Sequence, residues 1–159
     1  IPSNVKILML TVPAVQYTVN EINTFKSFAA DGGRIIFMGE HQGAYPGISI
    51  ENQFLLNMGA VLHNTGGAVD CQTQAGEYFP AQPSPGVVHP IMVGVNELSI
   101  ACASVIEPGP DDFPLFYDTT GTLVLGGVAK IDTTPIAELR SQHIRVAAPG
   151  KFVADPTRR

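Results

Sequence analysis

The residues best placed for chemistry are Glu40 and His41, which directly follow the segment RIIFMG. A Glu–His pair at the end of a strand could act as a general base or bind a metal ion. Adjacent strand residues point to opposite faces, so the two side chains share one site only if the strand ends before Glu40. The alternative is a polar strand end whose Glu and His hydrogen-bond to the glycine-rich loop that follows. Ligands of open α/β sheets bind beyond the carboxyl ends of the strands, which adds four candidate ligand-binding residues: Thr11, Tyr45, Glu51 and Asn52.

Other catalytic and binding motifs are missing from the sequence. No serine stands in a Gly-x-Ser-x-Gly pattern, and neither a Walker A sequence nor a Gly-x-Gly-x-x-Gly fingerprint is present. The spacings of His63, Asp70 and His89 match no zinc pattern. We therefore predict neither a metal nor a cofactor, and a hydrolase or nucleotide-binding enzyme of standard type is disfavoured.

The two cysteines, Cys71 and Cys102, allow two interpretations. In an exported protein they could form a disulfide, which would stabilise the fold by roughly 3–4 kcal/mol on the chain-entropy model. The alternative is two buried thiols, because Cys102 lies within an apolar segment. We favour the disulfide.

Charge is scarce throughout the chain. Only 14% of the 159 residues are charged, against about 25% in a typical domain. Such a surface suits an exported protein or one that covers much of its exterior with other subunits, although a monomer that is simply poor in charge is the alternative. The net charge of −5 argues against nucleic acid as a partner. No apolar run is long enough to span a bilayer, and the start of the sequence, which has no initiating Met, reads as a processed end.

The first sixty residues carry an alternation of strand and helix signals. Residues 6–12 form an apolar run typical of a strand buried on both faces. Thr18 and Glu21 then have the spacing of a capping box, and the helix they begin should end at Gly32 and Gly33. A second strand follows at 34–41. A second helix is predicted from Ser49 to a stop at Gly59.

The rest of the chain is less regular. Residues 63–90 are rich in Gly, Pro and polar residues and predict a long loop. Three strands are expected at 98–106, 114–118 and 122–131, as an antiparallel addition to the sheet. Together these elements predict one α/β domain over residues 1–146, a three-layer sandwich around a mostly parallel sheet of the flavodoxin or glutamine amidotransferase type. Residues 147–159 predict an extended tail.

Several segments resemble those of domains with the class I glutamine amidotransferase-like fold. They are YTVNEINTFKSFAADGGRIIFMGEH, LLNMGA, HPIMVGVNELS and VLGGVAKI, and the resemblance covers roughly residues 5–131. Amidotransferases of this fold carry a nucleophilic Cys at a strand-to-helix elbow. The nearest equivalent here, residues 39–43, reads GEHQG and has no Cys. The resemblance therefore implies a fold, without the family's catalytic nucleophile.

Two functional hypotheses follow. The first is a non-catalytic, exported or extracellular domain that serves assembly or binding, as a homo-oligomer or with other protein subunits. An open sheet that lacks its last strand would leave an edge for another chain to fill. The second is a hydrolase-like enzyme or small-ligand binder that uses Glu40 and His41 on a carbohydrate or amide. The missing nucleophile and the low charge favour the first.

Overall fold

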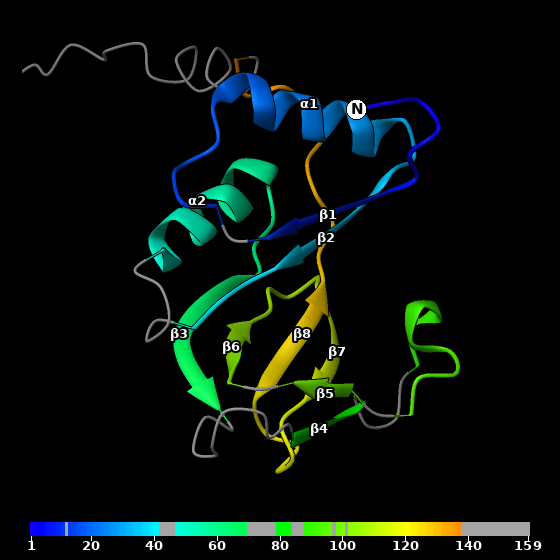
Figure 1. Cartoon of the computed structure of the whole chain (residues 1–159), viewed down its shortest axis with the longest axis vertical. Coiled ribbons are helices and arrows are strands. Elements are labelled where there is room, and N and C mark those ends of the chain that lie inside the picture. The colour runs from blue at the N-terminus through cyan, green and yellow to red at the C-terminus, as the bar shows by residue number, and fades with distance from the viewer. Residues whose placement is uncertain are drawn as a thin grey trace, which may run out of the picture.

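A computed structural model describes residues 1–11, 13–41, 47–69, 79–83, 88–96, 98–100 and 102–137, with the backbone alone at 79–83 and 99. In the described part, two helices lie on one side of a short pair of parallel strands, and antiparallel strands lie toward the other side (Figure 1). The predicted tail at 147–159 and the predicted domain boundary at 146 lie outside the described residues. No helix among the described residues is both long and apolar enough to cross a bilayer.

The first β-α-β unit confirms the prediction from local signals. Strands β1 (Ile7–Thr11) and β2 (Arg34–Met38) pair in parallel, and helix α1 (Val19–Ala30) connects them. The Thr18 hydroxyl accepts a hydrogen bond from the Glu21 backbone N–H, and the Glu21 carboxylate accepts one from the Thr18 backbone N–H at 2.7 Å. These bonds satisfy backbone donors that the first helical turn leaves without partners, which fixes where α1 begins.

Helix α2 (Ile48–Met58) begins one residue before the predicted position and ends where predicted. Gly59 adopts the left-handed conformation, with a φ of +82°, and its N–H bonds back to the carbonyls of the last turn. Glycine has no Cβ to clash in this conformation, so it can stop the helix without strain.

The core lies between the two helices and one face of β1 and β2. Its buried members are Ile22 of α1 together with Phe54 and Met58 of α2. The ring of Phe54 lies 4.8 Å from the ring of Phe37 and 5.2 Å from that of Tyr17. Apolar residues of both strands pack against this cluster: Leu10, Ile35 and Phe37.

The chain after β8 returns to both helices. The Asp132 N–H donates to the Met58 carbonyl at 2.9 Å, and the Ile136 N–H donates to the Asn23 side chain at 3.0 Å. The Lys26 side chain, only 1% exposed, donates from Nζ to the Asp132 carbonyl at 2.6 Å. Burial lowers the pKa of Lys26, and the nearby Asp132 carboxylate opposes that shift. These bonds hold residues 132–136 against the helical layer.

The predicted three-layer sandwich with a mostly parallel sheet is wrong. Parallel pairing stops at β1 and β2, and all other described pairings are antiparallel. Parallel strands need long crossover connections, usually helices, and none is described after α2. The antiparallel strands form two sheets, β3–β6 and β5–β4–β7–β8, from β3 (His63–Val69), β4 (Phe79–Pro83), β5 (Leu98–Ile100), β6 (Ala103–Glu107), β7 (Phe113–Tyr117) and β8 (Val124–Val128).

Two further predictions are corrected by the same strands. The segment 63–90, predicted as a loop, contains β3, β4 and the start of the short 3-10 helix η1 (Pro90–Met92). The single strand predicted at 98–106 is broken at Cys102, whose φ is +51°. A non-glycine residue in this conformation turns the chain sharply, so the two halves join different sheets.

Candidate functional site

Glu40 and His41 lie just beyond the carboxyl end of β2, which ends at Met38. Their side chains are therefore not forced to opposite faces of a strand. One Glu40 carboxylate oxygen accepts from the His41 backbone N–H at 2.9 Å and lies 3.7 Å from the His41 Nε2. The Glu40 side chain is 44% exposed and that of His41 is 17% exposed. The bond from the His41 backbone is the kind that the alternative interpretation, a polar strand end, expects.

A second carboxylate, Glu51, lies against this strand end from the first turn of α2. It is only 3% exposed, and its two oxygens accept from the Glu40 N–H at 3.2 Å and from Asn64 Nδ2 at 2.9 Å. Burial raises the pKa of Glu51, the two hydrogen bonds oppose the rise, and the Glu40 charge adds to it. A Cβ at Gly39 would overlap the Glu51 carboxylate, so any larger residue there would displace this buried group from its hydrogen bonds.

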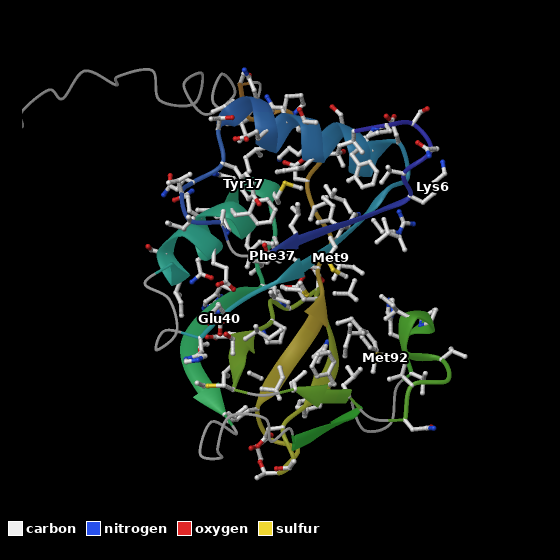
Figure 2. The ribbon with its side chains drawn as sticks, viewed as in Figure 1. Lys6, Met9, Tyr17, Phe37, Glu40 and Met92 are labelled. Carbon is white, nitrogen blue, oxygen red and sulfur yellow. The ribbon has the colours of Figure 1, made fainter. Side chains whose placement is uncertain are left out.

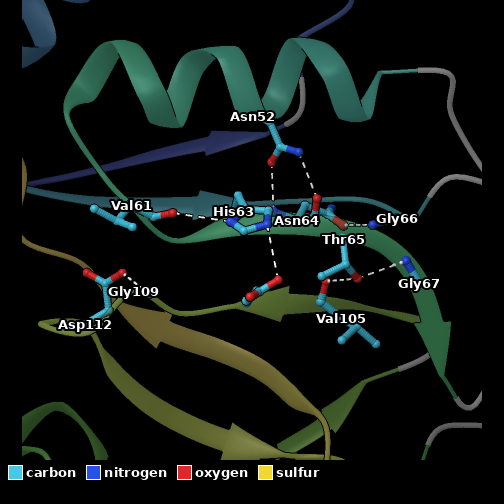
Figure 3. A network of polar contacts seen from close by, with 11 residues as sticks. Asn52, Val61, His63, Asn64, Thr65, Gly66, Gly67, Val105, Gly109 and Asp112 are labelled. Atoms are coloured by element: carbon cyan, nitrogen blue, oxygen red, sulfur yellow. Dashed lines mark hydrogen bonds and ion pairs between the residues drawn. The ribbon is translucent and has the colours of Figure 1, made fainter.

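Asn64 of β3 is the centre of the polar contacts. Its Nδ2 donates to the Glu40 carbonyl at 2.9 Å and to the Ser104 hydroxyl at 3.1 Å, besides Glu51. Its backbone N–H and carbonyl both bond to the side-chain amide of Asn52, at 2.7 and 2.8 Å (Figure 3). We call Glu40, Glu51, Asn52, Asn64 and Ser104 the polar cluster. It joins β2, α2, β3 and β6.

The sequence predicted three of the five residues of the polar cluster. Asn64 and Ser104 were missed. Asn64 falls in the segment predicted as a loop, and Ser104 falls within the strand predicted at 98–106. The local signal that could have found it is Asn64-Thr65-Gly66-Gly67, where the pairing of β3 with β6 is irregular and Gly66 has a φ of +82°. Within this irregular stretch, the side-chain oxygen of Asn64 accepts from the Gly66 N–H at 2.8 Å.

The raised pKa of Glu51 predicts how stability depends on pH. The folded state binds a proton at Glu51 more tightly than the unfolded chain does, so protonation of Glu51 stabilises the fold. This stabilisation is complete below the ordinary pKa of 4.5 and is lost as the pH rises through the raised pKa. Urea unfolding between about pH 4 and pH 8 should show this decline, and Glu51→Gln should remove it. Asp111→Asn, at an exposed position, is the control. An unchanged pH profile in Glu51→Gln would contradict the assignment.

The remaining candidate residues do not join the polar cluster. Thr11 lies on the face of β1 that points away from α2, and Tyr45 and Asp70 lie outside the described residues. His63 pairs with Glu107 at 3.5 Å, and the His89 ring accepts from the Ile91 N–H at the start of η1. No group of three possible metal ligands occurs among the described residues.

A cavity of about 310 Å³ lies at the opposite end of the parallel strands from the polar cluster. Residues 1–3, 5 and 6 and the outer side of α1 line it, including Lys6, Thr24, Phe28 and Asp31. Every buried side-chain nitrogen and oxygen in the described residues has a hydrogen-bond partner, so no buried polar group is left to orient a ligand there.

The face of β1 and β2 that points away from the helices is exposed, and four of its six residues are apolar. Side chains alternate along both strands, so the prediction that β1 is buried on both faces is wrong. The exposed fractions are 60% for Ile7 and Met9, 40% for Ile36 and 43% for Met38 (Met9 is labelled in Figure 2). We call this the open face; the parallel register pairs its six residues as Ile7 with Arg34, Met9 with Ile36 and Thr11 with Met38.

Cys102 is disulfide-bonded, which agrees with the interpretation of oxidised cysteines. Cys71, the only other cysteine of the chain, lies outside the described residues. The pairing of Cys71 with Cys102 therefore stays a prediction.

The chain matches no protein-family model, no curated protein and no solved structure. The resemblance to amidotransferase-like domains therefore stays a prediction, and its expectation of a mostly parallel sheet is corrected by the antiparallel strands described above.

Proposed function

We propose that this chain is a non-catalytic domain of an exported or extracellular protein, and that it binds protein subunits through the open face. The observation that carries the proposal is the exposure of Ile7, Met9, Ile36 and Met38 on one face of a parallel strand pair. Contiguous apolar surface of this kind is typical of protein interfaces. Soluble parallel sheets are normally covered on both faces, because crossover helices pack on each side.

Two other features support the proposal. A disulfide-bonded Cys102 fits an oxidising compartment outside the cytosol. The polar cluster favours a structural role for the strand end, since Glu51 and Asn64 bond to other parts of the chain. A net charge of −5 argues against nucleic acid as the partner.

The four methionines of the chain allow a direct test. Met9 and Met38 lie on the open face, whereas Met58 and Met92 are 2% and 8% exposed and serve as internal controls. Hydrogen peroxide oxidises accessible thioethers. We expect Met9 and Met38 to oxidise several-fold more slowly in unrefolded material from the natural source than in the dilute, purified domain. Met58 and Met92 should react slowly in both. Equal rates for Met9 and Met38 in the two samples would refute the proposal.

A second candidate function is a hydrolase-like enzyme or a binder of a small carbohydrate or amide at the polar cluster. A buried carboxyl group with a raised pKa beside Glu40 is the observation that favours it, because perturbed carboxyl groups gather at functional sites. Ligand screens with the wild type, Glu40→Gln and His41→Ala test it. Unchanged affinity or activity in both variants would exclude it.

A further inference from the structure

No helix among the described residues covers the open face in the way that a second layer normally covers parallel strands. Helices α1 and α2 cover the face formed by Leu10, Ile35 and Phe37. The antiparallel strands lie toward the other side (Figure 1), yet Ile7 and Met9 on that side remain 60% exposed. In parallel β-α-β architectures, a second face of this kind is covered by helix.

The dimensions of the open face fit a single helix. Each strand has five residues, which at about 3.3 Å per residue gives a length of roughly 16 Å. The two strands lie about 5 Å apart, and a helix with its side chains is about 10 Å wide. One helix of about eleven residues, lying along the strands, would therefore cover both of them.

The charge of the open face restricts the chemistry of that helix. Arg34 is its only charged residue, and it lies at the amino end of β2. Its Nη1 donates to the carbonyls of Gly32 and Gly33, at 2.9 and 3.1 Å, which holds the guanidinium at that end. A guanidinium has five N–H donors, so further donors remain to meet a carboxylate. The other residues of the face are apolar except Thr11.

A second copy of the chain does not supply such a helix from its described part. The exposed side of α1 is polar, with Asn20, Thr24 and Ser27, and its only exposed large apolar residue is Val19. The only one on α2 is Leu56, which is 66% exposed. A single apolar residue on each helix does not form the stripe that recurs every three to four residues.

We infer that the open face binds one amphipathic helix of a partner protein, with an apolar stripe over Met9, Ile36 and their neighbours and an acidic residue beside Arg34. This inference rests on the proposed function and adds the identity of the bound element. Methionine is suited to such a face, because its flexible thioether adapts to the shape of an apolar partner.

The test uses a synthetic helical peptide of about fifteen residues, with leucines at the i, i+3, i+4 and i+7 spacing and glutamates at one end. Binding is followed by the methyl NMR signals of the four methionines, at up to about millimolar peptide. We expect the signals of Met9 and Met38 to shift, while those of the buried Met58 and Met92 stay in place. A peptide of the same composition without the stripe should cause no shift.

Two variants assign the contacts. Met9→Lys should abolish the shift at Met38, and Arg34→Glu should weaken binding several-fold while favouring a peptide with lysines at its end. Circular dichroism verifies that both variants are folded. Equal shifts with the peptide that lacks the stripe, or no shift at all, would overturn the inference.

The outcomes separate this inference from the proposed function. If Met9 and Met38 shift with protein concentration alone, a second copy occupies the open face and the helix inference fails, while the proposed function stands. If the peptide does not bind but Met9 and Met38 still oxidise slowly in source material, another kind of partner covers the open face and the helix inference fails. Unprotected methionines in source material would remove the proposed function itself.

Discussion

Replacing Phe54 with alanine should destabilise the fold by about 3–5 kcal/mol, the usual cost of removing a large aromatic core residue. Phe54 is 4% exposed, and its ring contacts those of Phe37, Tyr17 and Phe25, with the last at 6.0 Å. The substitution leaves a cavity between α2, α1 and β2 and removes three ring pairs at once. Urea unfolding followed by far-UV circular dichroism measures the loss, since the chain has no tryptophan.

Leu56→Ala is the matched control for this prediction. Leu56 lies two residues further along α2 and is 66% exposed, so its truncation should change the free energy of unfolding by less than about 0.5 kcal/mol. A comparable loss in both variants would mean that α2 does not bury Phe54 in the way the structure describes.

Asn64→Asp should be as damaging as Phe54→Ala at neutral pH, at about 3–5 kcal/mol, although the two side chains have nearly the same shape. The change removes the Nδ2 group, which donates to Glu51, Glu40 and Ser104. The oxygen that replaces it, when ionised, accepts hydrogen bonds but donates none. Two buried carboxylates would then lie about 3 Å apart. Such a pair raises its own pKa, so the variant should regain stability as pH falls.

Thermal or urea unfolding of Asn64→Asp between about pH 4 and pH 8 measures this recovery. Asn20→Asp is the control, because it adds the same charge at an exposed position in the first turn of α1, where a negative charge is slightly favourable. If Asn64→Asp were equally destabilised at every pH, proximity to Glu51 would not be the cause.

The elements that the sequence predicted correctly are those whose boundaries are determined by neighbouring residues. The capping box of Thr18 and Glu21 and the left-handed stop at Gly59 each act over a few residues. The parallel pairing of β1 with β2 then follows from the helix between them. These signals do not depend on the rest of the fold.

The wrong predictions concern strands whose partners lie far along the chain. His63 of β3 pairs with Glu107 of β6, and no local pattern of Gly, Asn and Thr reveals that partner. The apolar segment around Cys102 has the composition of one strand, but the positive φ at that residue divides it. The apolar run at β1 predicted a strand buried on both faces, because the sequence does not distinguish apolar residues on an exposed face from those in a core.

The polar cluster was only partly predictable for the same reason. Glu40 is a candidate because it follows a strand, and Glu51 is a candidate because it lies close to that strand end in the sequence. Their contact depends on Asn64 from a third element, which brings an amide between a carbonyl and a carboxylate. Composition carries no information about such a contact between distant residues.

The hydrogen bonds between residues 132–136 and the helices have a consequence for biosynthesis. Among the described residues, Lys26 donates to the Asp132 carbonyl and the Asn23 side chain accepts from the Ile136 N–H, so two side chains of α1 bond to residues made more than a hundred positions later. A ribosome that adds about 5–20 residues per second needs at least several seconds to supply them. Until then the ammonium group of Lys26 stays in water, and the nascent helical layer remains open to chaperones and proteases.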